Sequence, residues 1–335
     1  MAGVAGVQWS PKSPRRIACP SVQHLATAIL FMNPAYRTDF EAHLEHAARL
    51  ACILEATARK PGNVHPDKSF ADICYNDFVE IATVTAPIVA RAGEIGVGRC
   101  ILEAVQRSQA VTSHNANLGI VLLLAPLAAV PEDVLLSTGI REVLDDLTQH
   151  DAELCYRAIR LAQPGGLGKA HCEDVAGTPT VSLRAAMRLA ADRDTIAAQY
   201  ANGFQLVLDR GLSILRSIED FPSNWEMAII TLHLQLMAEY PDSLIERKCG
   251  REVAEQASRR SADVLAAGWP RSKEGRLCCT EFDGWLREAG NRRNPGTTAD
   301  LIAAVLFAGF RDRLLAEPPF PKGTISTECK IDADE

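Results

Sequence analysis

The stretch from residue 118 to residue 130 most constrains what this chain can fold into. Within it, residues 120–129 are apolar almost without interruption. A helix that is apolar on every side must be covered on every side. The sequence therefore predicts a core with this helix at its centre and other helices around it. The stretch is too short to cross a bilayer, and Pro126 interrupts it, so no membrane association is expected.

The remaining sequence repeats helical periodicity and shows no useful run of alternating polar and apolar residues. Leu44, Ala47, Ala51 and Leu54, for instance, recur at steps of three and four. The predicted fold class is all-α, with ten or more helices. Asn76 and Asp194 are expected N-caps, and the segment 272–293, rich in glycine and charge, is expected to be a loop. The predicted helices are 41–59, 77–92, 99–111, 120–129, 132–148, 150–162, 181–191, 194–217, 223–239, 246–267 and 298–315.

The chain of 335 residues is at the upper edge of what one core holds. We expect a single all-α domain over residues 41–316. Residues 1–40, which contain three spaced prolines and an arginine pair, are expected to be a disordered extension, and residues 317–335 a disordered tail.

Composition excludes some functions. The net charge of −7 supplies no basic field for nucleic acid. The ten cysteines have neither zinc-site nor disulfide spacing, and Cys52, Cys74, Cys100 and Cys155 are expected to be small apolar residues inside helices. A reduced, cytoplasmic protein is therefore the expectation.

The segment Lys60-Pro-Gly-Asn-Val-His65 ends the first predicted helix with turn residues. Pro61 disfavours helical angles at Lys60, and Gly62 adopts angles closed to other residues. Such a turn presents polar side chains and free N–H groups at a cleft, or it is an ordinary helix terminator.

A second polar segment, 112–119, leads into the apolar helix. The N–H groups at such a helix start favour anions, so Asn115 and Asn117 are candidate ligand contacts or plain caps. Two glycine-rich runs, 93–98 and 164–169, have neither dinucleotide-binding nor P-loop spacing.

Four segments together resemble the triphosphoribosyl-dephospho-CoA synthase family. They occur in the family's order, over about residues 40–316. Departures exist: Ala116 and Asn117 stand in a segment where the family has a His-Lys pair, His65 stands in place of an aspartate, and Thr297-Thr298 in place of two glycines. The similar segments are Glu55–His65 (E-x-x-x-x-K-P-G-x-V), Asn115–Gly119 (N-T-H-K-G), Asp242–Arg247 with Gly250 (D-T-x-x-x-x-R-x-G), and Asn294–Leu301 (P-G-G-x-A-D-L).

The resemblance implies an ATP-dependent transfer. The 2′-hydroxyl of 3′-dephospho-CoA would attack C1′ of the ATP ribose, and adenine would leave. Displacement at an anomeric carbon passes through an oxocarbenium-like state. It calls for carboxylates, a proton donor for the leaving base, and cations or magnesium for the triphosphate.

The resemblance also points to site residues. Asp72, Asp300 and His65 are expected to be catalytic, although His65 is equally well a solvent-facing loop residue. Asp242 and Asp300 are expected to hold Mg²⁺, although Asp300 in a first helical turn also suits the helix dipole. Asp174 would reach a metal or cap a helix. Substrate contacts are expected from Lys60, Gly62, Asn63, Asn115, Asn117, Gly119, Arg247 and Gly296.

Three alternatives stay open at this point. The first is a related transferase in cofactor assembly, such as for one-carbon metabolism, motivated by the departures at Ala116, Asn117 and His65. The second is a non-catalytic helical scaffold or cofactor-binding protein. The third is an ADP-ribosyl hydrolase, also helical with clustered aspartates. Convergence of the polar turns on one cleft would favour an enzyme; the oligomeric state is left open.

Overall fold

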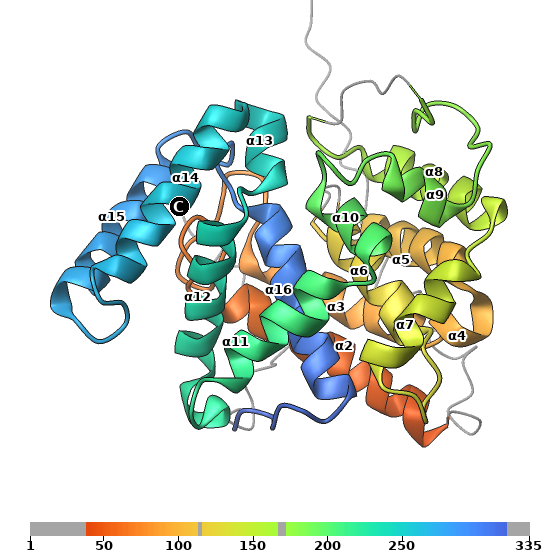
Figure 1. Cartoon of the computed structure of the whole chain (residues 1–335), viewed down its shortest axis with the longest axis horizontal. Helices are drawn as coiled ribbons and strands as arrows, with labels where there is room; N and C mark the ends of the chain where they lie inside the picture. Colours follow the sequence, from red (N-terminus) through yellow and green to blue (C-terminus); the bar gives the residue numbers. More distant parts are fainter. Residues whose placement is uncertain (1–37, 113–115, 167–171, 320–335) are drawn as a thin grey trace, which may run out of the picture. The chain divides into compact units, whose positions relative to one another are not determined.

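The computed structural model describes residues 38–112, 116–166 and 172–319 (Figure 1). All described residues from Asp39 onward belong to one unit. The expected extension and tail, 1–40 and 317–335, lie largely outside the described residues.

Helices follow one another along the described chain, and its only β pairing is a single bridge between His65 and Lys68. The all-α prediction is confirmed. No described helix is both long and apolar enough to cross a membrane. The helices are α2 (Asp39–Thr57), α3 (Tyr75–Val89), α4 (Ala92–Ile95), α5 (Val97–Val111), α6 (Leu118–Ala128), α7 (Leu136–Asp145), α8 (Gln149–Ala162), α9 (Leu183–Arg188), α10 (Thr195–Asn202), the π-helical turn η2 (Leu206–Gly211), α11 (Leu212–Arg216), α12 (Phe221–Glu239), α13 (Ser243–Cys249), α14 (Arg251–Ala266), α15 (Lys273–Arg287) and α16 (Gly296–Arg311).

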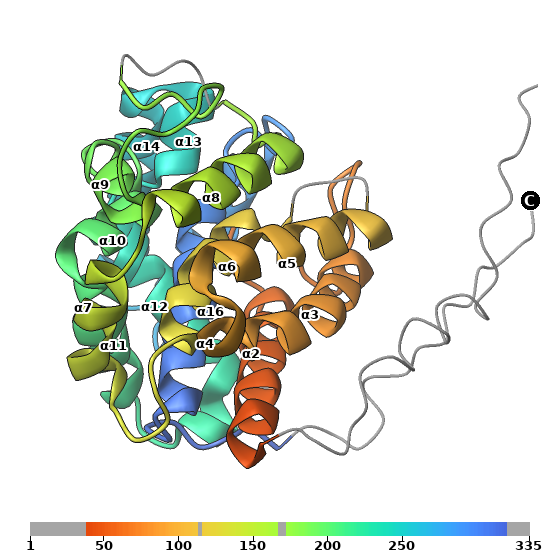
Figure 2. The ribbon, with the colours of Figure 1, turned by 90° about the vertical axis from the view of Figure 1, so that its right-hand side faces the viewer.

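Two helices share the centre of the main core. Every residue of α6 except Gly119 is buried, which confirms the central apolar helix. Helix α16 is buried continuously from Leu301 to Arg311 and packs against α2, α6 and α12. Figure 1 shows α16 running between the α12–α15 group and the α5–α8 group. Helix α3 packs against both α2 and α5 (Figure 2).

Helix α12 separates the main core from a second, smaller core. Ile229 and Leu232 face the main core, whereas Ile230 and Leu234 face the second core, which α13, α14 and α15 complete. A helix that is buried on two faces carries apolar residues almost all round. This second core supports the turn that follows α2.

The prediction of a loop over 272–293 was wrong, because α15 occupies most of it. Ser272 caps this helix, and its hydroxyl accepts a hydrogen bond from the N–H of Gly275 at 2.8 Å. Cys279, Phe282 and Leu286 form its buried face. Their three- and four-residue spacing was a usable signal that the glycines and charges obscured.

Other helix boundaries also differ from expectation. Helix α3 begins after Cys74, not Asn76, and Cys74 is exposed. The predicted helix 246–267 divides at Gly250, whose φ of +91° breaks the helix. Asp194 is confirmed as the N-cap of α10, because its carboxylate accepts hydrogen bonds from the N–H groups of Ile196 and Ala197.

Candidate active site

A cavity of about 680 Å³ lies among α2, α6, α8, α9, α10, α13 and α16. All four segments singled out in the sequence contribute to its lining. Part of the lining is apolar, and includes Tyr156, Ile159, Leu183, Met187 and Ile196. The lining also contains many polar groups, among them Glu55, Asn63, Asp72, Asp174, Arg193, Asp194, Glu246, Arg247, Lys248, Asn291, Asn294 and Asp300. An apolar cavity with a few converging polar groups is the usual form of a ligand site.

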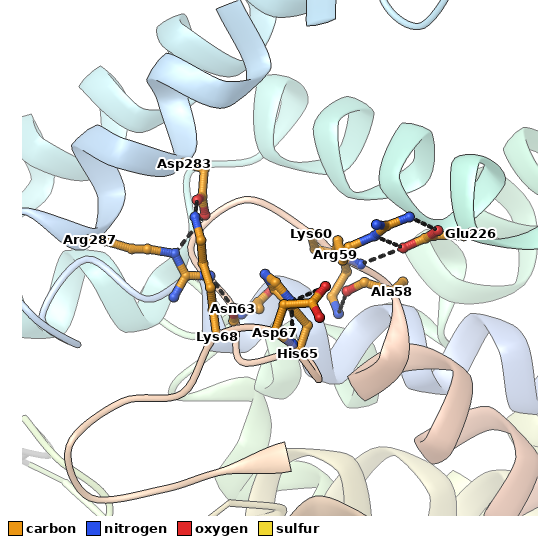
Figure 3. A network of polar contacts seen from close by, with 10 residues as sticks. All are labelled: Ala58, Arg59, Lys60, Asn63, His65, Asp67, Lys68, Glu226, Asp283 and Arg287. Atoms are coloured by element: carbon orange, nitrogen blue, oxygen red, sulfur yellow. Dashed lines mark hydrogen bonds and ion pairs between the residues drawn. The ribbon is translucent and has the colours of Figure 1, made fainter. Parts of the chain in front are cut away.

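Lys60 does not face this cavity. Its side chain is fully buried, and its ammonium group lies 3.0 Å from the carboxylate of Glu55. It also donates to the backbone carbonyl of Glu55 and to that of Ala58, the second of which Figure 3 shows. The turn that ends α2 thus folds the lysine back onto the helix. The expectation of a cation presented to phosphate is corrected: the ammonium group is occupied by the end of α2.

The turn itself is anchored by α15, the helix that was expected to be a loop. Asp283 accepts a hydrogen bond from the N–H of Gly62 at 2.8 Å. It also accepts one from Lys68 at 2.6 Å (Figure 3). Arg287 donates to Asp283 at 2.7 Å and to the carbonyl oxygen of Asn63. Gly62 has a φ of +77°, and an added Cβ would come within 2.7 Å of Leu286. Gly62 is therefore a packing residue, outside the cavity lining.

His65 also lies outside the cavity lining. It is 5% exposed, and its Nδ1 accepts a hydrogen bond from the N–H of Asp67 at 3.3 Å. Burial and the positive charge of Arg287 lower the pKa of His65. A buried imidazole held neutral inside the loop is in position to support the turn, and we do not carry it forward as a catalytic group.

Asn63 faces the cavity beside Val64. Its amide nitrogen donates to the side chain of Asn294 at 2.8 Å, and this contact links the turn to the segment before α16. The side-chain oxygen of Asn63 is buried without a hydrogen-bond partner among the described residues. Such an acceptor is available to a ligand donor.

Asn115 and Asn117, near the start of α6, were both expected to contact the ligand. Asn115 lies outside the described residues. Asn117 is buried away from the cavity, and its side chain accepts a hydrogen bond from Ser108 at 2.9 Å. Ala116 and Gly119 do line the cavity. A Cβ at Gly119 would collide with the carboxylate of Asp300, so the glycine makes room for that group.

Asp242 is not a metal ligand candidate in this structure. One carboxylate oxygen accepts from the N–H groups of Leu244 and Ile245, at 2.9 and 3.0 Å. The other accepts from the N–H and hydroxyl of Thr298, at 2.7 and 2.8 Å. It is 2% exposed and absent from the cavity lining. Asp242 therefore joins the starts of α13 and α16, and its lone pairs are used.

Asp300 differs from Asp242 in its position and its hydrogen bonding. It lines the cavity, and no described residue donates a hydrogen bond to it. Because α16 starts at Gly296, Asp300 lies beyond the first helical turn, which removes the helix-dipole explanation. Burial and the charges of Glu55 and Asp242 raise the pKa of Asp300 well above its usual range, against the effect of Arg247. A perturbed carboxyl group in a cavity is a typical functional group.

Three cations line the cavity. Arg247 donates to Asp194 at 2.7 Å, while its Nε is buried without a hydrogen-bond partner among the described residues. Lys248 is the next residue on α13, and burial together with Arg247 lowers its pKa. Arg193 precedes α10. Sequence reasoning found Arg247 but missed Lys248, Arg193 and Glu55, although all three are close to named residues in the chain.

The three remaining candidate residues from the sequence, Asp72, Asp174 and Gly296, all line the cavity. Asp72 is exposed at the cavity and accepts from Asn291 at 3.2 Å. Asp174 lines the cavity and accepts from the N–H of Ala176, so it stabilises its loop. Gly296 lines the cavity at the start of α16. Within the described residues no group of three or more His, Cys, Asp or Glu side chains is placed to hold a metal ion.

Comparison with known proteins adds to this geometry. The model of the ATP:dephospho-CoA triphosphoribosyl transferase family matches residues 41–318. A solved structure from Archaeoglobus fulgidus, provisionally described as a triphosphoribosyl-dephospho-CoA synthase, has a TM-score of 0.55 and 24% identity. The alignment covers 69% of this chain and 97% of that one, and shows a shared fold. The search of curated proteins returned no match. Because the family match spans most of the chain and every segment that builds the cavity, this protein belongs to the ATP:dephospho-CoA triphosphoribosyl transferase family and is a transferase.

Proposed function

We propose that the cavity binds ATP and 3′-dephospho-CoA together and transfers the triphosphoribosyl group between them. The 2′-hydroxyl of dephospho-CoA attacks C1′ of the ATP ribose, and adenine leaves. One observation carries the proposal. Segments from residues 55 to 301 meet at one cavity, and a carboxyl group without a hydrogen-bond donor, Asp300, faces into it. A scaffold protein has no need of such a group, because a partly buried carboxyl group without a partner is unfavourable for folding.

The cationic side of the cavity suits the triphosphate. Arg247 and Lys248 on α13 and Arg193 in the turn before α10 all line this cavity. A guanidinium group binds phosphate oxygens through paired hydrogen bonds, and Arg247 still has a free Nε–H for this purpose. These three cations take the place that sequence reasoning gave to Lys60.

The apolar part of the lining offers contact surface for the adenine base and the pantetheine arm. Tyr156, Met187 and Ile159 supply flat and flexible apolar surface from α8 and α9. This surface lies in the same cavity as the cations, so one ligand can contact both.

Magnesium is best placed on the nucleotide. Asp242 is fully used by four hydrogen bonds, so the expected pair of protein carboxylates for Mg²⁺ is not formed, and we do not retain Asp300 as a metal ligand. Mg²⁺ is commonly held by one or two carboxylates together with phosphate oxygens and water. We therefore treat it as part of the Mg–ATP substrate, and we assign no step to a protein-bound ion.

The proposal is tested by incubating the protein with ATP, dephospho-CoA and magnesium, and measuring free adenine by chromatography. We expect adenine only when both substrates are present. Replacing Arg247 with methionine removes a charge-assisted phosphate contact, so the KM for ATP should rise about 10- to 100-fold. Arg276→Met is the control, because Arg276 is exposed on α15 outside the cavity lining and bonds only to nearby carbonyls. Absence of adenine with both substrates would contradict the proposal.

A related acceptor is the second candidate. Ala116 before α6 and Leu118 at its first position line the cavity, in the segment where the family pattern carries a His-Lys pair. Less charge there would accommodate a less anionic acceptor than dephospho-CoA. Running the same assay with CoA, dephospho-CoA and simpler ribonucleosides as acceptors would decide this, because only the true acceptor releases adenine at saturating rates.

A further inference from the structure

Two carboxyl groups in the cavity lining have different surroundings. Glu55 projects from α2 and Asp300 from α16, two helices that pack directly against each other. The Glu55 carboxylate has a buried counter-charge, the ammonium group of Lys60 at 3.0 Å. The Asp300 carboxyl group has no hydrogen-bond donor among the described residues. One carboxyl group therefore has a positively charged partner in contact with it, and the other has none.

The other charged groups around Asp300 agree with this arrangement. Glu55, Asp242 and Asp194 are negative and disfavour a further charge, as does burial. The positive charge of Arg247 acts in the other direction and favours the charged form of Asp300. The positive end of the α6 helix dipole, which adjoins Asp300 at Gly119, acts in the same direction as Arg247. Burial has the largest effect, and the pKa of Asp300 is raised well above its usual range.

Two neighbouring groups are excluded from proton transfer by their own environments. Burial, Glu55 and Asp300 raise the pKa of Cys52 to about 12, so its thiol stays protonated. Behind Lys60, the fully buried ring of His233 has a pKa lowered to about 3 by burial and by the charge of Lys60. Lys60 is therefore the cation that acts on Glu55, and its contacts with the carbonyls of Glu55 and Ala58 hold it in place.

We propose that Asp300 is the proton donor of the transfer, that Glu55 is the proton acceptor, and that Lys60 is the positioning residue that divides these roles. This division rests on the proposed function above. Paired carboxyl groups with separated protonation states are a known means of running acid and base catalysis in one site.

The step balances as follows. The oxygen of the acceptor 2′-hydroxyl forms a bond to C1′ of the ATP ribose, and the bond from C1′ to N9 of adenine breaks. The hydroxyl proton passes to Glu55, while the Asp300 proton passes to a ring nitrogen of the departing adenine. Each turnover leaves Glu55 protonated and Asp300 charged, and exchange with water restores both. No oxidant or reductant takes part.

The test uses Lys60→Met in the full-length protein, a change that keeps the length of the side chain and removes its charge. We expect kcat to fall at least tenfold while the KM for ATP changes less than threefold. A loss of ATP binding alone would raise the KM, so a fall in kcat at a nearly constant KM distinguishes the positioning role from a binding role. Lys273→Met is the control, because Lys273 is an exposed lysine at the start of α15 and lies outside the cavity lining. Its kcat and KM should match those of the wild type. A rise in the KM for ATP with unchanged kcat would overturn the proposal.

A direct measurement keeps the proposal testable if Lys60→Met does not fold. Infrared difference spectra of the wild type against Asp300→Asn should show the carbonyl stretch of a protonated carboxyl group at neutral pH. Its absence would overturn the proposal even if transfer is observed. Its presence in a protein that releases no adenine would leave the protonation state of Asp300 standing and refute the proposed function alone. Glu55→Gln should lower kcat at least tenfold with little change in the KM for ATP, and an unchanged kcat would also contradict the assignment.

Discussion

At the scale of single residues, Asp242 and Asp300 show how far sequence can separate roles. Both lie close to predicted helix starts, and both were expected to hold magnesium. The structure gives Asp242 four hydrogen bonds and Asp300 none among the described residues. The difference depends on where α16 begins and on the approach of Thr298 to Asp242. Neither is visible in a local pattern, because both follow from packing between distant segments.

The two aspartates should respond in opposite ways to the same substitution. The raised pKa of Asp300 means that the folded state binds this proton more tightly than the unfolded state. The free energy of folding gained from binding this proton is therefore largest below about pH 4, and it is lost as the pH rises through the folded-state pKa of Asp300. Asp300→Asn should raise the thermal midpoint at pH 8, with the gain shrinking toward pH 4, while adenine release falls at least 100-fold.

Asp242→Asn is the comparison. Burial raises the pKa of Asp242 as well, but its hydrogen bonds oppose this effect. An amide places an NH₂ group against N–H or hydroxyl donors, so about 2–3 kcal/mol of stability should be lost. Thermal denaturation of both variants at pH 4 and pH 8 checks this pair. Destabilisation of similar size in both would mean that Asp300 is a structural residue.

At the scale of elements, the turn after α2 and helix α15 depend on each other. The sequence showed the turn, because Pro61 and Gly62 act locally. It did not show the partner, because α15 was hidden by Gly275 and Gly284 and by its charged face. The turn was expected to present Lys60 to a ligand. Instead, contacts with α15 orient the turn so that Asn63 faces the cavity and Lys60 is buried.

Gly62→Ala tests this docking. Gly62 has a φ of +77°, and a Cβ would come within 2.7 Å of Leu286 and 2.9 Å of Pro295. Gly203 has a similar φ of +80° but open space around it, so Gly203→Ala measures the backbone cost alone. We expect a loss of about 1 kcal/mol for Gly203→Ala and about 1–3 kcal/mol more for Gly62→Ala. Urea denaturation of the two variants gives the difference, and equal losses would show that α15 does not confine the turn.

His233 on α12 should make the fold sensitive to acid. Neither ring nitrogen has a hydrogen-bond partner among the described residues, and the pKa is lowered to about 3. A lowered folded-state pKa gives stability that is complete above the unfolded value of about 6.5 and is lost as pH falls toward 3. At pH 4 the loss should be on the order of 3 kcal/mol.

His233→Leu should reduce the difference between the free energies of unfolding measured at pH 7 and at pH 4, because the group that must be protonated in acid is gone. The control is His150→Leu, because the His150 side chain is 74% exposed. An unchanged difference between the two pH values in His233→Leu would mean that other groups govern acid unfolding.

At the scale of the whole molecule, the order of four segments along the chain was enough to predict the family. Helix periodicity predicted the all-α fold, and the continuous apolar character of residues 120–129 predicted the central position of α6. The composition of the cavity was predicted only in part, with Asn63, Asp72, Gly119, Arg247, Gly296 and Asp300 found in its lining. The residues that were missed, such as Glu55 and Lys248, are positioned by tertiary packing rather than by local signals. The net negative charge is compatible with the proposed triphosphate site, because Arg247 and Lys248 of α13 and Arg193 before α10 all line the cavity.

The stoichiometry of adenine release tests the central claim most directly. The protein is incubated with Mg–ATP and dephospho-CoA, and adenine, remaining dephospho-CoA and the mass of the product are measured over time. We predict one adenine formed for each dephospho-CoA consumed, with a product heavier by one triphosphoribosyl group and no ADP, AMP or pyrophosphate. Adenine without consumption of the acceptor would indicate hydrolysis of the nucleotide, and ADP or pyrophosphate in place of adenine would indicate phosphoryl or nucleotidyl transfer. Either result would contradict this account.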